Sequence, residues 1–277
     1  MAADPFTSTE PRLRALAYRM LGSHADAADA VQDTATKWLS TDRSIIENPE
    51  AWLVRTCTRA SIDLLRRRKR EAYVGPWLPE PSTEDAGDLP ALAESVRLAF
   101  LLMLERLSPA ERAALLLHDV FDEDYSAIAS AIGSSEAMAR QHVSRARRRI
   151  AEDRARFAVA PHAERDLMER FGAAVAAGDL AGLTALFAPD AELRSDGGGK
   201  RAAALNVITG ADRIARFFLG ITRKHPYQLR PAIINGALGG LQIEQGEISG
   251  ALSFATDGDR ITGVFFQRNP DKLARVH

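Results

Sequence analysis

The sequence predicts a multidomain protein with two all-α helical domains followed by an α+β domain. Apolar residues recur at helical spacing on both sides of a proline-rich stretch at residues 73–93. Strand-like runs separated by Asn-Gly, Gln-Gly and Asp-Gly turns fill the chain from Tyr227 to Gln267. A length of 277 residues agrees with two or three domains. The predicted divisions are helical domains at 1–72 and 94–157, a linker at 73–93 and an α+β domain at 163–277.

Charge is patterned along the chain, although the formal net charge is only −1. Basic residues cluster at Arg66–Arg70 and Arg145–Arg149, whereas the linker is acidic. This pattern argues against a uniformly basic nucleic-acid binder and favours local DNA contacts or their internal masking.

Cys57 is the only cysteine, which excludes an internal disulfide and a cysteine metal cluster. No apolar run approaches the roughly 20 residues of a membrane helix, and no signal-peptide core is present. We therefore expect a cytoplasmic protein with no membrane contact, no metal and no cofactor.

The first helical domain begins with helical periodicity from Pro11 to Leu39, broken at Gly22 and Ser23. The second of these helices, from His24, carries an acidic face whose simplest interpretation is solvation. Asn48 and Pro49 then predict the start of a helix that runs from Ala51 to about Arg70. One face of that helix holds Trp52, Arg55 and Arg59. An aromatic ring between guanidinium groups could contact an unstacked base, but Trp52 equally fits the edge of the core.

The best-defined pair of helices lies between Asp122 and Ile150. Asp124 fits the N-cap of the first helix, Gly133 fits its C-cap, and Ser134 or Ser135 caps the second helix. On the second helix the apolar stripe is Ala139, Val143, Ala146 and Ile150, and the opposite face carries Arg140, Gln141, Ser144, Arg145 and Arg148. Arginine and glutamine can form paired hydrogen bonds with base edges in the major groove. An arginine-rich solvated helix is the alternative, but caps, turn and stripe together favour a DNA-reading helix-turn-helix.

Three segments in order, DAADAVQDTATKWL, NPEAWLVRTCTRASIDLLRRRKR and LSPAERAALLLHDVFDEDYSAIASAIGSSEAMARQHVSRARRRI, resemble regions 2 and 4 of an extracytoplasmic-function sigma factor. The resemblance covers about residues 8–155. It implies two partners, core RNA polymerase (through its β′ coiled coil and β subunit) and promoter DNA, and no catalysis by the chain itself. By motif position it assigns polymerase binding to Asp29, Gln32, Asp33 and Thr36. It assigns the −10 element to the 40–48 loop with Trp52, Arg55 and Arg59, and the −35 element to the basic face of the second helix.

The C-terminal segment predicts helices at 164–177, 180–187 and 211–224. It predicts strands at 191–194, 227–234, 238–243, 247–255 and 260–267, the last four as an antiparallel meander. This order resembles the SnoaL-like, nuclear-transport-factor-2-like cone. Three short motifs together resemble the sigma-factor subgroup with a fused SnoaL-like domain: Trp77, Leu78, Pro79, Glu80 and Pro81 (WLPEP); Asp196, Gly197, Gly198, Gly199 and Lys200 (DGGGK); Asn269, Pro270, Asp271, Lys272 and Leu273 (NPDKL). The subgroup implies regulation in cis, with the extra domain acting in place of a separate anti-sigma protein.

Other functions of the C-terminal domain stay open from the residues alone. DGGGK lacks the Walker spacing, because Arg201 stands where a serine or threonine is needed. The three glycines instead fit a close backbone approach to region 2 or to WLPEP, which Asp196 and Lys200 would hold by charge. Cones of this kind can carry an acid or base in an apolar pocket, with Asp190, Asp196, Arg194 and His225 as candidates, or bind a small-molecule ligand. A helix-turn-helix regulator fused to a ligand-binding or polyketide-cyclase-like enzymatic domain is therefore the alternative to a sigma factor.

Overall fold

A computed structural model describes residues 4–68, 73–83, 98–154, 161–274 and 276. The chain divides into two compact units. Unit 1 comprises Met1–Ala72 with Met103–Glu152, and unit 2 comprises Tyr73–Leu102 with Asp153–His277. The described part of the predicted linker thus belongs to the same unit as the C-terminal domain. The sequence also predicts a helix at 91–107. Part of it, and the predicted domain boundaries after residues 72, 93 and 157, fall in residues 69–72, 84–97 and 155–160, which lie outside the described residues.

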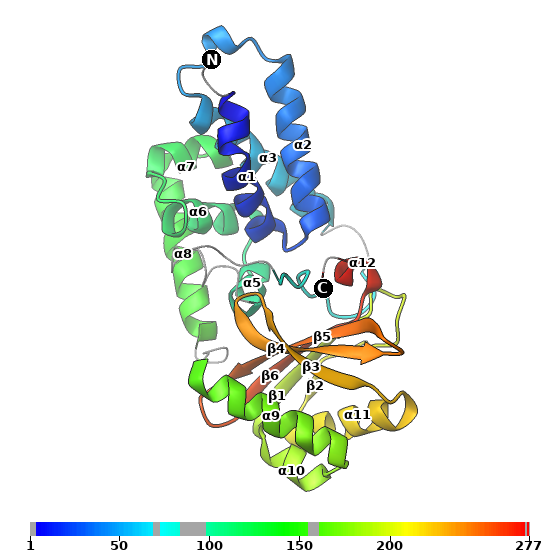
Figure 1. Cartoon of the computed structure of the whole chain (residues 1–277). Coiled ribbons are helices and arrows are strands. Elements are labelled where there is room, and N and C mark those ends of the chain that lie inside the picture. Colours follow the sequence, from blue (N-terminus) through cyan, green and yellow to red (C-terminus); the bar gives the residue numbers. More distant parts are fainter. Residues whose placement is uncertain (1–3, 69–72, 84–97, 155–160, 275, 277) are drawn as a thin grey trace. The chain divides into compact units, whose positions relative to one another are not determined.

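The N-terminal part of unit 1 is a three-helix domain whose helices α1 (Pro5–Leu21), α2 (His24–Ser40) and α3 (Pro49–Arg68) pack on one another (Figure 1). The first helix begins before the predicted Pro11. Gly22 ends α1 with a φ of 62°, and the Asn48 side chain accepts a hydrogen bond from the Ala51 amide at 3.1 Å. The loop between α2 and α3 contains the short 3-10 helix Arg43–Ile45 (η1). Leu13, Leu16 and Leu53 are fully buried between the helices.

The second part of unit 1 contains α6 (Pro109–Asp119), α7 (Tyr125–Ile132) and α8 (Glu136–Arg154), after α5 (Leu98–Glu105). The predicted caps are present. Asp124 accepts from the Ala127 amide at 2.7 Å, Gly133 has a φ of 70°, and Ser135 rather than Ser134 accepts from the Met138 amide at 3.3 Å. The predicted helix-turn-helix is therefore α7 and α8.

Unit 2 is built on a six-stranded sheet in the order β2-β1-β6-β5-β4-β3. Its strands are β1 (Phe187–Asp196), β2 (Ile208–Thr209), β3 (Gln228–Ile234), β4 (Ala237–Glu244), β5 (Glu247–Thr256) and β6 (Ile261–Gln267). The predicted meander of β3 to β6 is antiparallel. The sheet as a whole is mixed, because β1 returns beside β6 in the parallel direction, with Leu193 opposite Val264.

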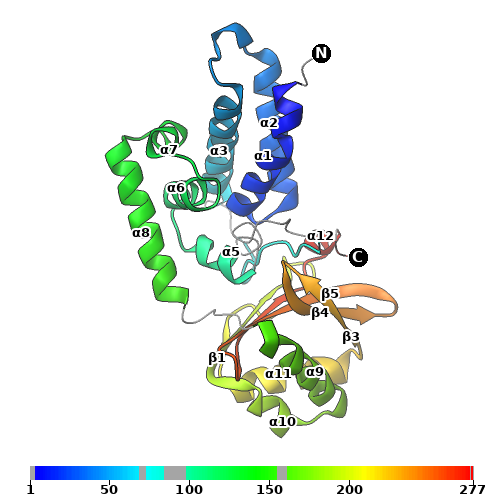
Figure 2. The same cartoon turned by 60° about the vertical axis from the view of Figure 1, so that its left-hand side comes forward.

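Helices α9 (Pro161–Ala177), α10 (Leu180–Ala185) and α11 (Ala211–Lys224) cover one face of this sheet (Figures 1 and 2). The space between helices and sheet is filled by aromatic rings: the Phe171 centroid lies 5.0 Å from that of Phe218 and 5.2 Å from that of Phe254. The opposite face carries α12 (Pro270–Leu273), whose Leu273 packs with Ile234 and Leu241. This is the predicted α+β cone, with a filled interior.

No helix within the described residues has both the length and the apolar character that a membrane crossing requires. The same residues contain no group of three histidine, cysteine or acidic side chains arranged to hold a metal ion.

Candidate nucleic-acid interface and linker anchor

The exposed face of α8 is the strongest candidate for base recognition. Ala139, Val143 and Ala146 are buried beneath it with at most 1% exposure. The predicted set lies together on the exposed face: Arg140, Gln141, Ser144, Arg145 and Arg148. Within the described chain, Arg145 and Arg148 have no hydrogen-bond or ion-pair partner, so their guanidinium groups are available to a ligand. Arg140 is partly engaged, since it bonds Glu136 at 3.1 Å and lies 4.8 Å from the Tyr125 ring.

Two further arginines, Arg147 and Arg149, hold α8 to α6. Arg147 donates to Asp119 from Nε at 3.0 Å, and Arg149 donates to Glu111 at 2.7 Å. Burial acts to raise the pKa of both carboxyls. The hydrogen bonds and positive charges around them outweigh burial, so the pKa of Glu111 and that of Asp119 lie below their ordinary values. An arginine run in sequence therefore separates into two arginines with structural partners and a set on the exposed face.

A second candidate surface is the acidic face of α2. Its four predicted residues are all exposed: Asp29, Gln32, Asp33 and Thr36. Leu39 continues the same helical face one turn later and is 73% exposed. Sequence reasoning missed Leu39, although its spacing of three residues from Thr36 was the available signal.

The three residues predicted for the −10 element do not form an open face. The Trp52 ring packs against Trp38, with centroids 5.7 Å apart. Arg59 donates from Nη2 to the Ser130 carbonyl at 2.7 Å and from Nε to the Ala131 carbonyl at 3.3 Å. Arg59 therefore caps the last turn of α7, where carbonyl groups lack helical partners and favour a cation. Arg55 lies beside it, with Nη1 3.4 Å from Ser130 Oγ.

A cavity of about 400 Å³ lies next to this contact. Trp52 and Arg55 line it together with residues of the preceding loop and of α7. Its residues come from both helical parts of unit 1, so in this compact form the predicted −10 residues lie against the helix-turn-helix, although the Arg59 side chain stays exposed.

Arg12 of α1 is a further link between the two helical parts, and sequence analysis did not identify it. Its guanidinium bonds Glu50 at the start of α3, Glu123 at 2.8 Å and the Phe121 carbonyl at 3.0 Å. Burial raises the pKa of Glu123, and Arg12 opposes that shift. The contact is long-range in sequence, and its residues give no local signal.

Replacing Arg12 by alanine is expected to lower the free energy of unfolding of unit 1 by about 1–3 kcal/mol, because a charge-assisted hydrogen-bond cluster is lost. Arg14→Ala is the matched control: Arg14 makes an exposed pair with Glu10 and should cost roughly 0.5 kcal/mol or less. Urea denaturation of the full-length chain measures both. Equal losses in the two variants would contradict the assignment of Arg12 as the link.

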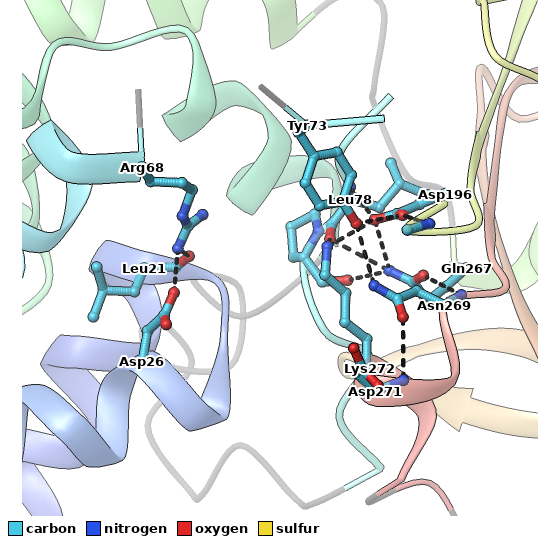
Figure 3. A network of polar contacts seen from close by, with 12 residues as sticks. Leu21, Asp26, Arg68, Tyr73, Leu78, Asp196, Gln267, Asn269, Asp271 and Lys272 are labelled. Atoms are coloured by element: carbon cyan, nitrogen blue, oxygen red, sulfur yellow. Dashed lines mark hydrogen bonds and ion pairs between the residues drawn. The ribbon is translucent and has the colours of Figure 1, made fainter. Parts of the chain in front are cut away.

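In unit 2, the three short motifs meet around the carboxylate of Asp196 (Figure 3). This side chain is fully buried. It accepts hydrogen bonds from the Leu78 amide at 2.9 Å, the Tyr73 hydroxyl at 2.6 Å and the Lys272 ammonium at 2.7 Å. A buried carboxylate requires such partners, because an unpaired charge in the interior is costly. Asp196 therefore joins DGGGK, the linker and NPDKL in a single site, which we call the linker anchor.

Lys272 also contacts the linker, at the Leu78 carbonyl and at two aromatic rings. Its Nζ donates to the Leu78 carbonyl at 2.7 Å and lies 4.3 Å from the Trp77 ring centroid and 5.0 Å from that of Tyr73. Gln267 donates to the Leu78 and Pro79 carbonyls at 3.3 Å. Backbone groups of the linker thus receive the donors and acceptors that a neighbouring strand would give.

The glycines of DGGGK allow a close approach of the backbone, but the nearest partner of Gly198 is Asn269 of NPDKL and not the predicted region 2 or WLPEP. Gly198 has a φ of 59°, and a Cβ there would lie 2.2 Å from Asn269 Nδ2. Asn269 in turn donates to the Tyr73 hydroxyl at 3.3 Å. Lys200 pairs with Asp271 of NPDKL at 2.6 Å on the surface.

The linker is held to unit 2 at two further places. The backbone N–H of Asn235 donates to the Ser82 carbonyl at 2.7 Å. Leu78 shares a buried cluster with Leu98 and Leu102 of α5 and with Ala255 and Phe265 of the sheet. The described residues 73–83 of the proline-rich segment and Leu98 of α5 therefore both rest on the C-terminal domain.

The candidate catalytic residues do not converge. Asp190 and His225 are exposed, Arg194 pairs with Glu192 at 3.1 Å, and Asp196 is committed to the linker anchor. Their positions give no acid–base pair facing a common cavity.

Comparisons with known proteins agree with these features. The Sigma-70 region 2 family matches residues 6–71, and the Sigma-70, region 4 family matches residues 97–150. The "ECF RNA polymerase sigma factor SigJ" of Mycobacterium tuberculosis (strain ATCC 25618 / H37Rv) is 36% identical over 99% of this chain and 93% of its own length. The "Probable ECF RNA polymerase sigma factor SigI" of Mycobacterium tuberculosis (strain CDC 1551 / Oshkosh) is 34% identical over 84% and 86%, respectively.

The fold is shared as well. The crystal structure of the Mycobacterium tuberculosis extracytoplasmic function sigma factor SigJ superposes with a TM-score of 0.74 at 34% identity, and the match covers 98% of this chain and 97% of that one. The predicted resemblance and the predicted fold class, helical sigma domains followed by an α+β domain, are both confirmed.

Proposed function

The chain belongs to the extracytoplasmic-function branch of the sigma-70 family of RNA polymerase sigma factors, and we propose that its C-terminal domain regulates it in cis. In this proposal the chain binds core RNA polymerase and directs it to promoters in the cytoplasm. The C-terminal domain acts as a built-in anti-sigma. No catalytic step is assigned to the chain.

The individual surfaces take the roles that their positions support. The exposed face of α8 reads the −35 element, the acidic face of α2 with Leu39 contacts the β′ coiled coil of the polymerase, and Trp52, Arg55 and Arg59 contact the −10 element. Support for the first two is their exposure. The third role requires a change, because Arg59 is bonded to α7 in the compact form.

Promoter geometry explains why the compact form needs to open. The −35 and −10 elements lie about 25 base pairs apart, which is roughly 85 Å of duplex at 3.4 Å per base pair. In unit 1, however, Arg59 of the −10 set lies 2.7 Å from Ser130 of the helix-turn-helix domain. Both elements can be contacted together only if these two parts separate.

The linker anchor is the observation that carries the proposal of regulation in cis. The segment between Arg68 and Leu98 would reach roughly 100 Å if it were free and extended. Asp196 and Lys272 hold Leu78 within it, and the cluster of Leu98 holds its far end. A linker held at these two points cannot extend fully, so the two DNA readers lose the reach that a promoter demands.

The anchor sets the position of an equilibrium. Each 1.4 kcal/mol by which it favours the closed form lowers the promoter-competent population about tenfold. Polymerase binding, or a ligand of the C-terminal domain, would shift the same equilibrium by its preference for one form.

The experiment replaces Gly198 by alanine and measures promoter-dependent transcription by the full chain with core polymerase. The added Cβ would collide with Asn269 and loosen the anchor, so transcription should rise severalfold. Gly178→Ala is the matched control: Gly178 also has a positive φ, 68°, but a Cβ there meets nothing within 4 Å. If both variants behave like the unmodified protein, the anchor does not regulate. If Gly198→Ala loses activity while Gly178→Ala keeps it, the anchored form is needed for initiation.

A further inference from the structure

A groove of about 840 Å³ lies on the C-terminal domain, between the edge strand β3, the β4–β5 turn and α12. It is separate from the interior of the cone, which the rings of Phe171, Phe218 and Phe254 fill. Its lining contains three arginines and one glutamate: Arg201, Arg230, Arg268 and Glu247. Leu229, Ile248 and Leu273 add an apolar wall. The groove thus combines a surplus of positive charge with an apolar surface.

Arg268 is the unusual member of this set, because it is only 6% exposed. Its Nη1 donates to the Ala202 carbonyl at 2.8 Å, and its Nη2 lies 3.4 Å from Glu244 Oε1. Its buried Nε–H has no acceptor in the described part of the chain. A buried donor without an acceptor is costly, and an incoming anion would satisfy it.

The charges around Arg268 are also not balanced. Arg201 lies 4.0 Å from the same Glu244 carboxylate, so two guanidinium groups share one carboxylate. Burial lowers the pKa of Arg268, Glu244 opposes this and the charge of Arg201 adds to it. Arg230 has no ion-pair partner among the described residues. The groove therefore offers an unmet requirement for negative charge.

We propose that this groove binds a small organic anion, a carboxylate or phosphate monoester with an apolar body. Guanidinium groups recognise both head groups through paired hydrogen bonds. Arg268 with Arg201 supplies the fixed part of such a site, and Arg230 supplies the exposed rim. The apolar wall takes the body of the ligand, as in small-molecule sites generally.

The groove shares a wall with the linker anchor. Pro270, Leu273 and Ala274 line it, while Asn269 and Lys272 of the same short segment hold Tyr73 and Leu78. An anion that moves α12 would therefore change the hold on the linker, a coupling that rests on the proposed regulation in cis. Binding itself requires neither polymerase nor DNA.

The experiment titrates the full-length chain with phenyl phosphate and with benzoate by calorimetry, using phenol as the neutral probe and inorganic phosphate as the head group alone. We expect saturable binding of at least one of the two organic anions, weaker binding of inorganic phosphate and none of phenol. Arg201→Ala and Arg230→Ala, both at exposed positions, should each weaken the organic anion about tenfold. Arg223→Ala is the control. It removes the same charge from an exposed position of α11 and should leave binding unchanged.

Absence of saturable binding of either organic anion up to about 10 mM would overturn the proposal. Equal weakening by Arg223→Ala would do the same, because it would show attraction by overall charge. The preferred organic anion identifies the head group. Loss of the sigma activity in a transcription assay would leave these binding results untouched, so the two proposals can fail separately.

Discussion

Replacing Asp196 by alanine is expected to release the linker and to cost about 3–5 kcal/mol of the stability of unit 2. The substitution leaves Lys272 buried at 8% exposure without its carboxylate, and an uncompensated buried charge is among the most damaging changes in a protein. The Leu78 amide donates a hydrogen bond to Asp196, so its hydrogen exchange should become faster in the variant. The denaturant midpoint should fall.

Two further variants separate the anchor from charge in general. Lys200→Ala removes a pair whose side chains are 56% and 62% exposed, and it should cost about 1 kcal/mol or less. Adding Lys272→Met to Asp196→Ala should restore part of the stability, because no unpaired buried charge remains. A loss in Lys200→Ala as large as that in Asp196→Ala would contradict the account of the anchor.

Replacing Arg145 by alanine is expected to weaken promoter binding by the holoenzyme by about 1–3 kcal/mol, or roughly 5- to 150-fold. Arg145 lies on the exposed face of α8 above the buried Val143 and Ala146, so its loss should leave folding intact. If Arg145 reads a base, the preference at one position of the −35 element should relax. A panel of promoters with single substitutions in that element measures this effect.

The salt dependence of the same binding gives a second criterion. A residue that only holds a phosphate should weaken all promoters equally and reduce the salt slope by about 1. Arg223→Ala on α11 is the control, because it removes the same positive charge as Arg145→Ala. Unchanged binding by Arg145→Ala would remove this residue from the −35 interface.

Local features of the fold were predictable because neighbouring residues determine them. Asp124, Gly133 and the apolar stripe of α8 define the helix-turn-helix within one short segment, and all three behave as expected. The pairing of β1 with β6 was not predictable in this way. A strand next to a meander can join either edge in either direction, and only the packing of the whole domain decides.

The candidate sites also divide into those set by local sequence and those set by long-range contacts. Exposed sets such as Asp29 and Asp33 on α2, or Arg145 on α8, follow from helical periodicity with the family resemblance. Arg59 does not, because its bonds reach α7 more than 70 residues away. Spacing alone likewise could not show that Lys272 pairs with Asp196, since a terminal NPDKL turn also fits an ordinary chain end.

Transcription by core polymerase on a target promoter, with the full chain compared with a chain ending after Arg156, tests the central claim most directly. The shortened chain keeps regions 2 and 4 but lacks the linker anchor. The account predicts promoter-dependent transcripts from both, with several times more from the shortened chain. Fewer transcripts from the shortened chain, although it still binds core polymerase, would contradict restraint in cis and make the C-terminal domain a required part of the initiating complex.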